Sequence, residues 1–488
     1  MLNNTHWDAL IPHNDLLNGI HDFYWIVGLV LIFFTFFSIV FREQLFVSEA
    51  LLATVVGIVV GPDVLKVFTP EDWFGAHDEI VLWEISRLVI SFQCLLVGIN
   101  LPNNYRSFLV TDMMFMVGPV MLCMWIISSI GIHLILGFTW ADSFILGACI
   151  TPTDPILASA IVSGKFSEKH LAPAVRSLIM AESGLNDGVG LLFLWIPFYI
   201  SRVSPTSEAV GWIFVKVFLY QIVLSIVVGL SIGLFFRWSL KKAVSKNYID
   251  ASYFPLICVA LLFGTVGMLT RLGVDDLLGC FFVGYALSYD EWFLNNLGGP
   301  HVFEMVDSFI NMIYFFVLGA LLPWTKFYEI GLVKLICLSA FVLAFRRLPA
   351  VMAFWKFVPS LKTRKDAFLT GWFGPIGAGA CFYATFAYDL GAHDDLVVSA
   401  VFIVFSSIIV HGASVFYLDY LLDEPVSINT IDEHEGDLPL CESLTLTEAG
   451  EAMEEGDLPL CESLTLTDDN ENSNTCGRVV MVPSKFLK

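Results

Sequence analysis

Long apolar stretches recur along almost the whole chain, and short polar segments separate them. Thirteen of them have a length suited to crossing the ~30 Å hydrocarbon core of a bilayer as α-helices; they lie near residues 22–41, 45–61, 80–100, 108–136, 141–163, 171–200, 209–236, 250–269, 274–288, 303–321, 328–348, 366–388 and 396–418. The stretches do not alternate apolar and polar at every second position, which argues against an outer-membrane barrel. The pattern predicts an all-α polytopic membrane protein whose transmembrane domain covers residues 22–422.

Composition supports this prediction and excludes several classes of protein. The 488 residues are 57% hydrophobic and 15% charged, with a mean hydropathy of +0.75, whereas soluble domains carry about 25% charged residues. A soluble enzyme, a nucleic-acid binder and a secreted disulfide scaffold are therefore excluded. The 10 cysteines include no Cys-x-x-Cys pair, so we expect neither a redox centre nor a bound cofactor.

Charge in the loops predicts the orientation of the chain. An odd number of spans places the two termini on opposite sides of the membrane. With the N-terminus outside, the cytoplasmic loops hold 12 Lys and Arg and the external loops hold 4, as the positive-inside rule requires. Residues 1–21 are then a short external segment and residues 423–488 a cytoplasmic tail. Because no Lys or Arg precedes Arg42, the first stretch lacks the basic start of a cleaved signal peptide and is expected to remain as a span.

The tail is acidic and contains a repeat. It holds 16 carboxylates and 3 basic residues, and its 13-residue segment 435–447 recurs unchanged at 455–467. Such a composition predicts disorder. The repeat is either a duplicated disordered segment or a duplicated docking motif for a cytoplasmic regulator. Thr445 and Thr465 each precede an acidic residue by three positions, which makes an acid-directed kinase a candidate partner.

The fifth span contains a helix-breaking motif around Asp154. Pro152 and Pro155 each remove a backbone donor and disfavour helical geometry in the preceding residue. Carbonyl groups freed at membrane depth need a cavity or protein around them. Together with the Asp154 carboxylate they form hard oxygen ligands suited to an alkali cation. The alternative is a kinked structural helix with a capping aspartate.

The sixth span brings four polar side chains to one face. Helical spacing places Glu182, Ser183, Asn186 and Asp187 within one arc of the helix. Two unpaired carboxylates there would be costly, so we expect one to be ion-paired and the other to bind protons or cations. A polar network that only packs helices is the alternative.

The twelfth span has a second break, at Gly374-Pro375-Ile376-Gly377. Breaks in spans five and twelve, seven spans apart, predict two inverted six-helix repeats joined by a linker helix, and paired broken helices indicate the central site of a transporter. Two further pairs have open roles. Asp275-Asp276 either caps the ninth span or forms a cation funnel. In Arg346-Arg347, one residue is expected to pair with Glu182 and the other to anchor the helix at the cytoplasmic surface.

These motifs occur in order over residues 40–420 and together resemble the monovalent cation/proton antiporter superfamily, most closely the fungal plasma-membrane Na⁺(K⁺)/H⁺ antiporters; they are 151–155, 182–188, 274–278, 346–349 and 374–377. The resemblance implies a homodimer in the plasma membrane with thirteen helices per chain. It also implies a dimerisation part and a mobile core part, and it implies that the broken helices of spans five and twelve cross at the ion site.

The resemblance assigns roles to individual residues. Asp187 corresponds to the aspartate that binds Na⁺ and protons, with Asp154, the Thr153 backbone and Ser183 as further Na⁺ ligands. Glu182 and Arg347 correspond to a structural ion pair. Asn186 before Asp187 is the pattern associated with electroneutral one-for-one exchange. The chain departs from many relatives at Asn100, where they carry a carboxylate, and from some at Trp372, where they carry histidine.

We therefore expect a secondary antiporter, not an enzyme, that exports Na⁺ and Li⁺, with K⁺ as a further candidate, in exchange for H⁺. Its physiological roles would be salt tolerance and cation and pH homeostasis. One buried carboxylate can hold either a proton or a cation, and this competition couples the two fluxes. The alternatives are a symporter of an organic anion with the same fold and a non-transporting polytopic receptor. The acidic groups at mid-membrane disfavour the first, and the two broken helices disfavour the second.

Overall fold

The computed structural model describes residues 21, 24–33, 36, 48–69, 78–102, 105–162, 165–296 and 301–422. Every regular element in these ranges is a helix. The described residues belong to one compact unit. The predicted tail with its repeat and most of the predicted external N-terminus lie outside the described residues.

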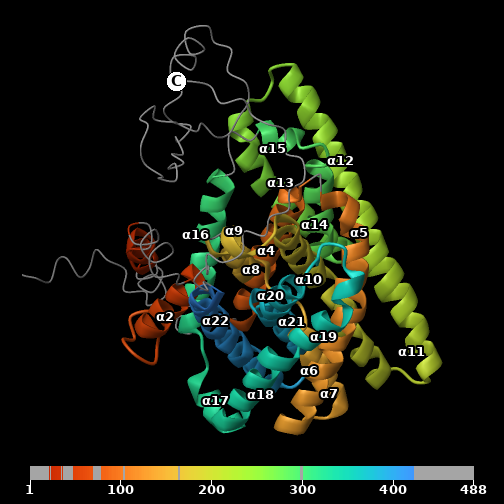
Figure 1. Cartoon of the computed structure of the whole chain (residues 1–488). Coiled ribbons are helices and arrows are strands. Elements are labelled where there is room, and N and C mark those ends of the chain that lie inside the picture. Colours follow the sequence, from red (N-terminus) through yellow and green to blue (C-terminus); the bar gives the residue numbers. More distant parts are fainter. Residues whose placement is uncertain are drawn as a thin grey trace, which may run out of the picture. The chain divides into compact units, whose positions relative to one another are not determined.

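The helices follow one another with short connections (Figure 1). In chain order they are α2 (Glu49–Val60), α4 (Asp78–Asn100), α5 (Arg106–Phe115), the π-helix η4 (Met116–Val120), α6 (Met121–Leu136), α7 (Trp140–Cys149), α8 (Pro155–Val162), α9 (Lys165–His170), α10 (Pro173–Arg202), α11 (Thr206–Trp212), the π-helix η5 (Ile213–Val223), α12 (Leu224–Ser245), the 3₁₀ turn η6 (Ala251–Tyr253), α13 (Phe254–Leu272), α14 (Asp276–Leu287), α15 (Trp292–Asn296), α16 (His301–Ala320), α17 (Trp324–Ile330), α18 (Leu332–Phe345), α19 (Leu348–Phe354), the 3₁₀ turn η7 (Trp355–Phe357), α20 (Arg364–Trp372), α21 (Ala378–Asp389) and α22 (Asp394–Leu422).

Among the described residues, five helical stretches are long and apolar enough to cross a membrane by length and composition; they are Arg106–Leu136, Thr206–Ser245, Phe254–Leu272, Leu332–Phe357 and Asp394–Asp419. A sixth arises if Val306–Ala320 and Trp324–Ile330, which meet at 59°, form one bent span. The chain is therefore a multi-pass membrane protein. The count of thirteen stays a prediction, because several expected spans are short or divided helices here.

Two of the expected spans are divided where the prolines stand. Helix α7 ends at Cys149 and α8 begins at Pro155, so residues 150–154 are not helical. Helix α20 ends at Trp372 and α21 begins at Ala378, which leaves residues 373–377 outside both helices. Proline fits the first turn of a helix, where its missing N–H is not needed, but it breaks a helix interior. Each division creates two helix ends that are buried inside the protein.

The helices pack in two connected groups. In one, α14 lies between α4 and α12, and α16 packs on α2 and α4. Glycines allow this close approach: a Cβ on Gly284 would stand 2.2 Å from the Leu95 carbonyl oxygen. In the other, α10 packs on α7, α8 and α21, while α6 and α22 pack on α18. The two groups meet at α10, which also contacts α4 and α14, and at α21, which packs on α4.

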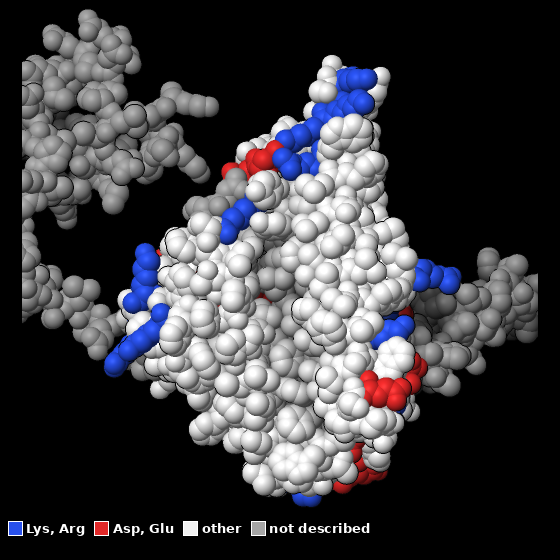
Figure 2. Space-filling view, turned by 90° about the vertical axis from the view of Figure 1, so that its right-hand side faces the viewer, with Lys and Arg blue, Asp and Glu red and all other residues white. Residues whose placement is uncertain are grey.

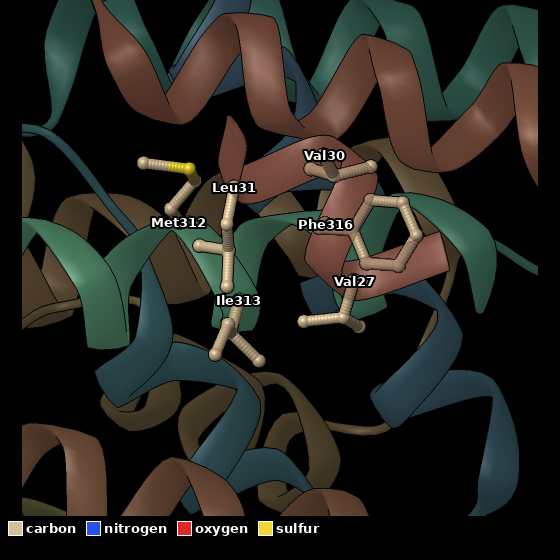
Figure 3. A pocket seen from close by; sticks show the side chains of 6 residues that line it. All are labelled: Val27, Val30, Leu31, Met312, Ile313 and Phe316. Carbon is tan, nitrogen blue, oxygen red and sulfur yellow. The ribbon is translucent and has the colours of Figure 1, made fainter. Parts of the chain in front are cut away.

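The helical segment Tyr24–Phe33 packs on α16 through apolar side chains. Figure 3 shows Val27, Val30 and Leu31 facing the α16 side chains of Met312, Ile313 and Phe316 around a small crevice. All six lining side chains are apolar. The contact therefore contributes burial and packing, and the polar site lies elsewhere.

Candidate ion-binding site

Helix α10 carries the polar face expected for the sixth span. Glu182, Ser183, Asn186 and Asp187 are each at most 1% exposed. Helical periodicity groups them on one side of α10, and the tertiary structure buries that side. Four polar groups removed from solvent in this way need partners within the protein.

The non-helical segment after α7 supplies partners to two of these side chains. The backbone N–H of Thr153 donates to Asn186 Oδ1 at 3.2 Å, and Asn186 Nδ2 donates to Thr153 Oγ1 at 2.9 Å. The hydroxyls of Thr153 and Ser183 share a hydrogen bond of 2.9 Å. These bonds fix the segment against α10 beside Asp187.

The two divided helices touch at their interruptions. The backbone N–H of Asp154 donates to the Pro375 carbonyl oxygen at 2.9 Å. A Cβ on Gly377 would stand 2.4 Å from Asp154 Cγ, and a Cβ on Gly379 would stand 2.5 Å from Asp187 Oδ1. Glycine is therefore required at both positions, because any side chain would displace a carboxylate.

The two site aspartates differ in how their oxygens are bonded. Asp154 Oδ2 accepts a hydrogen bond of 3.0 Å from the Leu157 N–H and so caps the start of α8. Among the described residues, Asp154 Oδ1 and both carboxylate oxygens of Asp187 have no hydrogen-bond partner. A buried carboxylate without a donor is costly unless a proton or a cation neutralises it. Asp187 is thus the group best prepared to exchange one for the other.

Glu182 lies on the same face but has an arginine partner. Arg347 forms a two-point ion pair with it, through Nη1 to Oε1 and through Nη2 to Oε2 at 2.7 Å. Arg347 Nε also donates to the Thr370 carbonyl at 3.0 Å. Both side chains are at most 3% exposed. The structure thus brings these two residues together, as the sequence analysis expected of Glu182 and one of the two arginines.

Arg346 differs from its expected role as an anchor at the membrane surface. It is 2% exposed, and its guanidinium donates to the carbonyl oxygens of Ile150, Thr151 at 3.1 Å, Pro152 at 3.4 Å and Gly374 at 2.5 Å. These carbonyls end α7 and follow α20, where helix dipoles leave partial negative charge. Its charge therefore stabilises the contact between the two interruptions. The sequence signal was the adjacency of two arginines at an apolar span.

Asp275 and Asp276 lie at the start of α14, close to the site but not in it. Asp275 is the N-cap of α14, because its Oδ1 accepts the Leu278 N–H at 2.9 Å. Asp276 Oδ2 accepts from Thr270 Oγ1 at 3.1 Å and lies 3.7 Å from Arg87 Nη1. Both aspartates are buried, at 3% and 8% exposure. Capping is thus evident, and a funnel role stays a prediction.

Asn100 and Trp372, the two positions at which the sequence departs from relatives, have different surroundings. Asn100 is the last residue of α4 and is exposed. The Trp372 indole N–H donates to Ser414 Oγ at 3.1 Å, and its carbonyl lies 3.1 Å from His411 Nε2. His411 is thus bonded within the protein. Asn100 is not among the groups that the structure brings to Asp187.

Comparison with protein families identifies the chain. The family model for the transmembrane sodium/hydrogen exchanger matches residues 29–418. The chain belongs to the sodium/hydrogen exchanger family. This match spans both interruptions, α10 and the paired arginines, so the whole candidate site of this exchanger-family chain lies within it.

Several fungal relatives are named antiporters. A Na⁺/H⁺ antiporter of Schizosaccharomyces pombe is 32% identical over 80% of this chain and 89% of its own length. A Na⁺/H⁺ antiporter of Saccharomyces cerevisiae is 35% identical over 75% of this chain but only 38% of its own length. A probable Na⁺/H⁺ antiporter of S. pombe is 32% identical over 81% of this chain and 56% of its own length. The chain spans about half the length, or less, of most of the fungal relatives it matches.

A solved structure has the same fold. The sodium proton antiporter of Methanocaldococcus jannaschii matches with a TM-score of 0.62, covering 84% of this chain and 98% of its own at 15% identity. The relatives and this fold place the exchanger-family chain among secondary transporters and not among enzymes.

Proposed function

We propose that this chain is a secondary antiporter that exchanges Na⁺ for H⁺ across the membrane. The observation that carries the proposal is the Asp187 carboxylate, which is fully buried and accepts no hydrogen bond from any described residue. Family membership supports the same activity. A proton or a cation neutralises such a group, and binding of one requires release of the other. Alternating exposure of the site to the two sides then couples the fluxes.

Asp187, Asp154, Thr153 and Ser183 are the proposed ligands of the transported Na⁺. Their contact through the Thr153–Ser183 and Thr153–Asn186 bonds supports this set. All would offer oxygen atoms, which hard cations prefer. Li⁺ uses the same donor chemistry, and K⁺ is a further candidate substrate. Asn186 would orient Thr153 and leave Asp187 as the exchanging acid.

The proposed architecture is that of thirteen spans in two inverted repeats with a linker helix. In it, α7 with α8 forms broken span five and α20 with α21 forms broken span twelve. The bond between Asp154 N–H and the Pro375 carbonyl supports a crossing of the two. Helix α8 and helix α21 both begin beside the carboxylates, so their positive dipole ends favour ionised groups there.

The proposed setting is the plasma membrane, with the N-terminus outside and the tail in the cytoplasm, and the proposed assembly is a homodimer. The excess of Lys and Arg in one set of loops supports the orientation. The fungal relatives are named Na⁺/H⁺ antiporters, and the proposed physiological roles are salt tolerance and cation and pH homeostasis. The acidic tail is proposed to contact a cytoplasmic regulator or kinase, and no nucleic acid takes part.

An organic-anion symporter of the same fold is less well supported. Such a substrate needs a cationic group, and the two arginines near the carboxylates are engaged, Arg347 by Glu182 and Arg346 by backbone carbonyls. At the candidate site, the described carboxylate oxygens without a hydrogen-bond partner are Asp154 Oδ1 and both oxygens of Asp187. They suit a cation.

Proton movement in proteoliposomes tests the proposal. The purified chain is reconstituted with an internal pH-sensitive dye and an imposed pH gradient, and Na⁺, Li⁺, K⁺ and succinate are added in turn. Dissipation of the gradient by Na⁺ or Li⁺ is expected. Gradient dissipation by succinate alone, or by none of the additions, contradicts antiport.

A further inference from the structure

The C-terminal end of α12 carries several basic side chains with aromatic side chains among them. We define the basic collar as Arg106, Arg237, Lys241, Lys242 and Lys246; all but Arg106 lie in or directly after α12. Figure 2 shows Lys and Arg gathered at the end of this tall helix, with acidic atoms beside them. Lys242 and Lys246 are exposed. The collar is remote in sequence from every proposed ion ligand.

Helix α12 belongs to the candidate span that the rest of the described chain covers least. It belongs to the 40-residue stretch Thr206–Ser245, whose most apolar window is only 22% buried, the lowest share of the five. At 1.5 Å per residue this stretch is ~60 Å long and exceeds the ~40–45 Å thickness of a bilayer with its headgroups. Exposed apolar residues continue to Phe235 and Trp238, which are 58% and 60% exposed. The basic collar begins where this exposed apolar face ends, as expected for side chains at the headgroups.

Aromatic rings lie against the side chains of the basic collar. Lys242 Nζ lies 5.0 Å from the Trp238 ring centre, and Lys241 Nζ lies 5.5 Å from that of Trp292. The Arg106 guanidinium lies 4.9 Å from the ring of Tyr289. Tryptophan and tyrosine favour the membrane interface, and lysine extends from there toward the phosphates.

Carboxylates near the collar offset only part of its charge. Asp290 accepts from Arg237 Nη2 at 2.6 Å and also from Lys241. Burial tends to raise the pKa of Asp290, but the hydrogen bonds and charges of Arg237 and Lys241 outweigh it and lower the pKa to about 2. Asp290 is therefore ionised throughout the neutral range. Asp250 and Glu291 are the other neighbouring acids in the sequence. Lys242 and Lys246 remain directed to solvent.

We propose that the basic collar binds the headgroup phosphate of an anionic phospholipid in the cytoplasmic leaflet. The predicted orientation places these loops on the cytoplasmic side, where anionic lipids are concentrated, and basic clusters next to a span bind them. The lipid-exposed flank of α12 would accommodate the acyl chains. This inference goes beyond the proposed antiport and does not depend on which cation is exchanged.

Lipid binding to the full-length detergent-solubilised protein tests the inference without measuring transport. Dioctanoyl phosphatidylserine is titrated against the wild type and against Lys242→Gln/Lys246→Gln, with dioctanoyl phosphatidylcholine as the neutral lipid. Each lysine near a membrane surface contributes about 1 kcal/mol, so the double variant should bind phosphatidylserine about thirtyfold more weakly. The matched control is Lys362→Gln/Lys365→Gln, which removes two exposed lysines from another predicted cytoplasmic loop.

The variant Asp290→Asn provides a second, independent test, because it removes the carboxylate that offsets the positive charges of Arg237 and Lys241. It should tighten phosphatidylserine binding, whereas a merely structural loss would weaken it. Equal binding by the wild type and the lysine variant would overturn the inference. So would equal weakening by the control pair, or equal affinity for phosphatidylcholine. Binding of inorganic phosphate or of a polyglutamate peptide in preference to phosphatidylserine would also overturn it, since either would identify a different ligand.

Discussion

Asp187 and Asp154 share one buried site but have unequal surroundings. Asp154 accepts the Leu157 N–H and caps α8, whereas both oxygens of Asp187 lack a donor among the described residues. A capped carboxylate is favoured in its ionised form. This difference supports the proposal that Asp187 carries the exchangeable proton.

Replacing Asp187 by asparagine should abolish exchange. The amide of Asp187→Asn can neither release a proton nor neutralise a cation, although it has nearly the same shape. Na⁺-dependent proton movement in proteoliposomes measures the effect, and size-exclusion chromatography checks folding. Asp142→Asn is the control, since Asp142 lies at the exposed start of α7, where it accepts from Thr139. Wild-type rates in Asp187→Asn would refute the assignment.

Glu182 and Arg347 should behave as one stabilising unit. Removing either partner leaves a buried charge unpaired, which typically costs ~3–5 kcal/mol. Glu182→Gln and Arg347→Gln should each lower the thermal unfolding temperature, and the double variant should recover part of the loss. If the losses in this double-mutant cycle simply add, the two side chains do not interact energetically.

At the scale of the elements, the two interruptions work as a pair. Residues 150–154 bring Thr153 and Asp154 to α10, while residues 373–377 supply the backbone that lies against them. Arg346 donates to carbonyls of both interruptions and so joins the ends of α7 and α20. Prolines divide the helices, and Arg346 donates hydrogen bonds to the carbonyl groups that the division leaves without helical partners.

A methyl group at Gly379 should impair exchange more than folding. Its Cβ would stand 2.5 Å from Asp187 Oδ1, so the carboxylate must move away from its position. We expect Gly379→Ala to lower the exchange rate at least about tenfold, equivalent to ~1.4 kcal/mol. Gly264→Ala on α13 is the matched control, because nothing lies within 4 Å of its added Cβ. An unchanged Na⁺ dependence in Gly379→Ala would show that Gly379 does not constrain the site.

At the scale of the whole molecule, the charge carried per cycle depends on how many carboxylates titrate. Span six offers Asn186-Asp187, Glu182 is paired with Arg347, and Asp154 caps a helix. These surroundings support the proposal of one exchangeable proton per bound cation, which predicts a cycle that moves no net charge.

The equilibrium of Na⁺/H⁺ exchange should therefore not depend on the membrane potential. A potential of 100 mV is worth ~2.3 kcal/mol for each charge moved, so an electrogenic cycle would shift its equilibrium measurably. The potential is clamped with K⁺ and valinomycin while Na⁺ is the substrate, and the final pH gradient is read. A gradient that follows the imposed potential would indicate a second proton, with Asp154 as its carrier.

The acidic tail should be dispensable for ion binding. All proposed ligands lie between residues 153 and 187, so truncation after Asp423 should leave the apparent Na⁺ affinity unchanged. Abundance, sorting or the pH set-point are expected to change instead. A tenfold shift of Na⁺ affinity in proteoliposomes would place the tail in the transport mechanism.

The sequence alone determined the features that local chemistry controls. Continuous apolar stretches predict helices in a membrane, Pro152, Pro155 and Pro375 mark where helices stop, and helical spacing gathers the polar residues of α10 on one face. Each depends on neighbours within a turn or two, so the linear order suffices. The family resemblance, confirmed by the match over residues 29–418, added residue roles that periodicity could not supply.

Only the tertiary structure decided which distant groups meet. Arg346 and Arg347 are adjacent and chemically identical, yet one pairs with Glu182 and the other binds carbonyls at two helix ends. The sequence indicated Gly377 only as part of a helix break, whereas the fold places Gly377 against Asp154 and Gly379 against Asp187. Asp275 became an identifiable cap only with its bond to Leu278. The physical reason is that side chains on one helix point in directions that differ by about 100° per residue, so each partner depends on how separate helices cross.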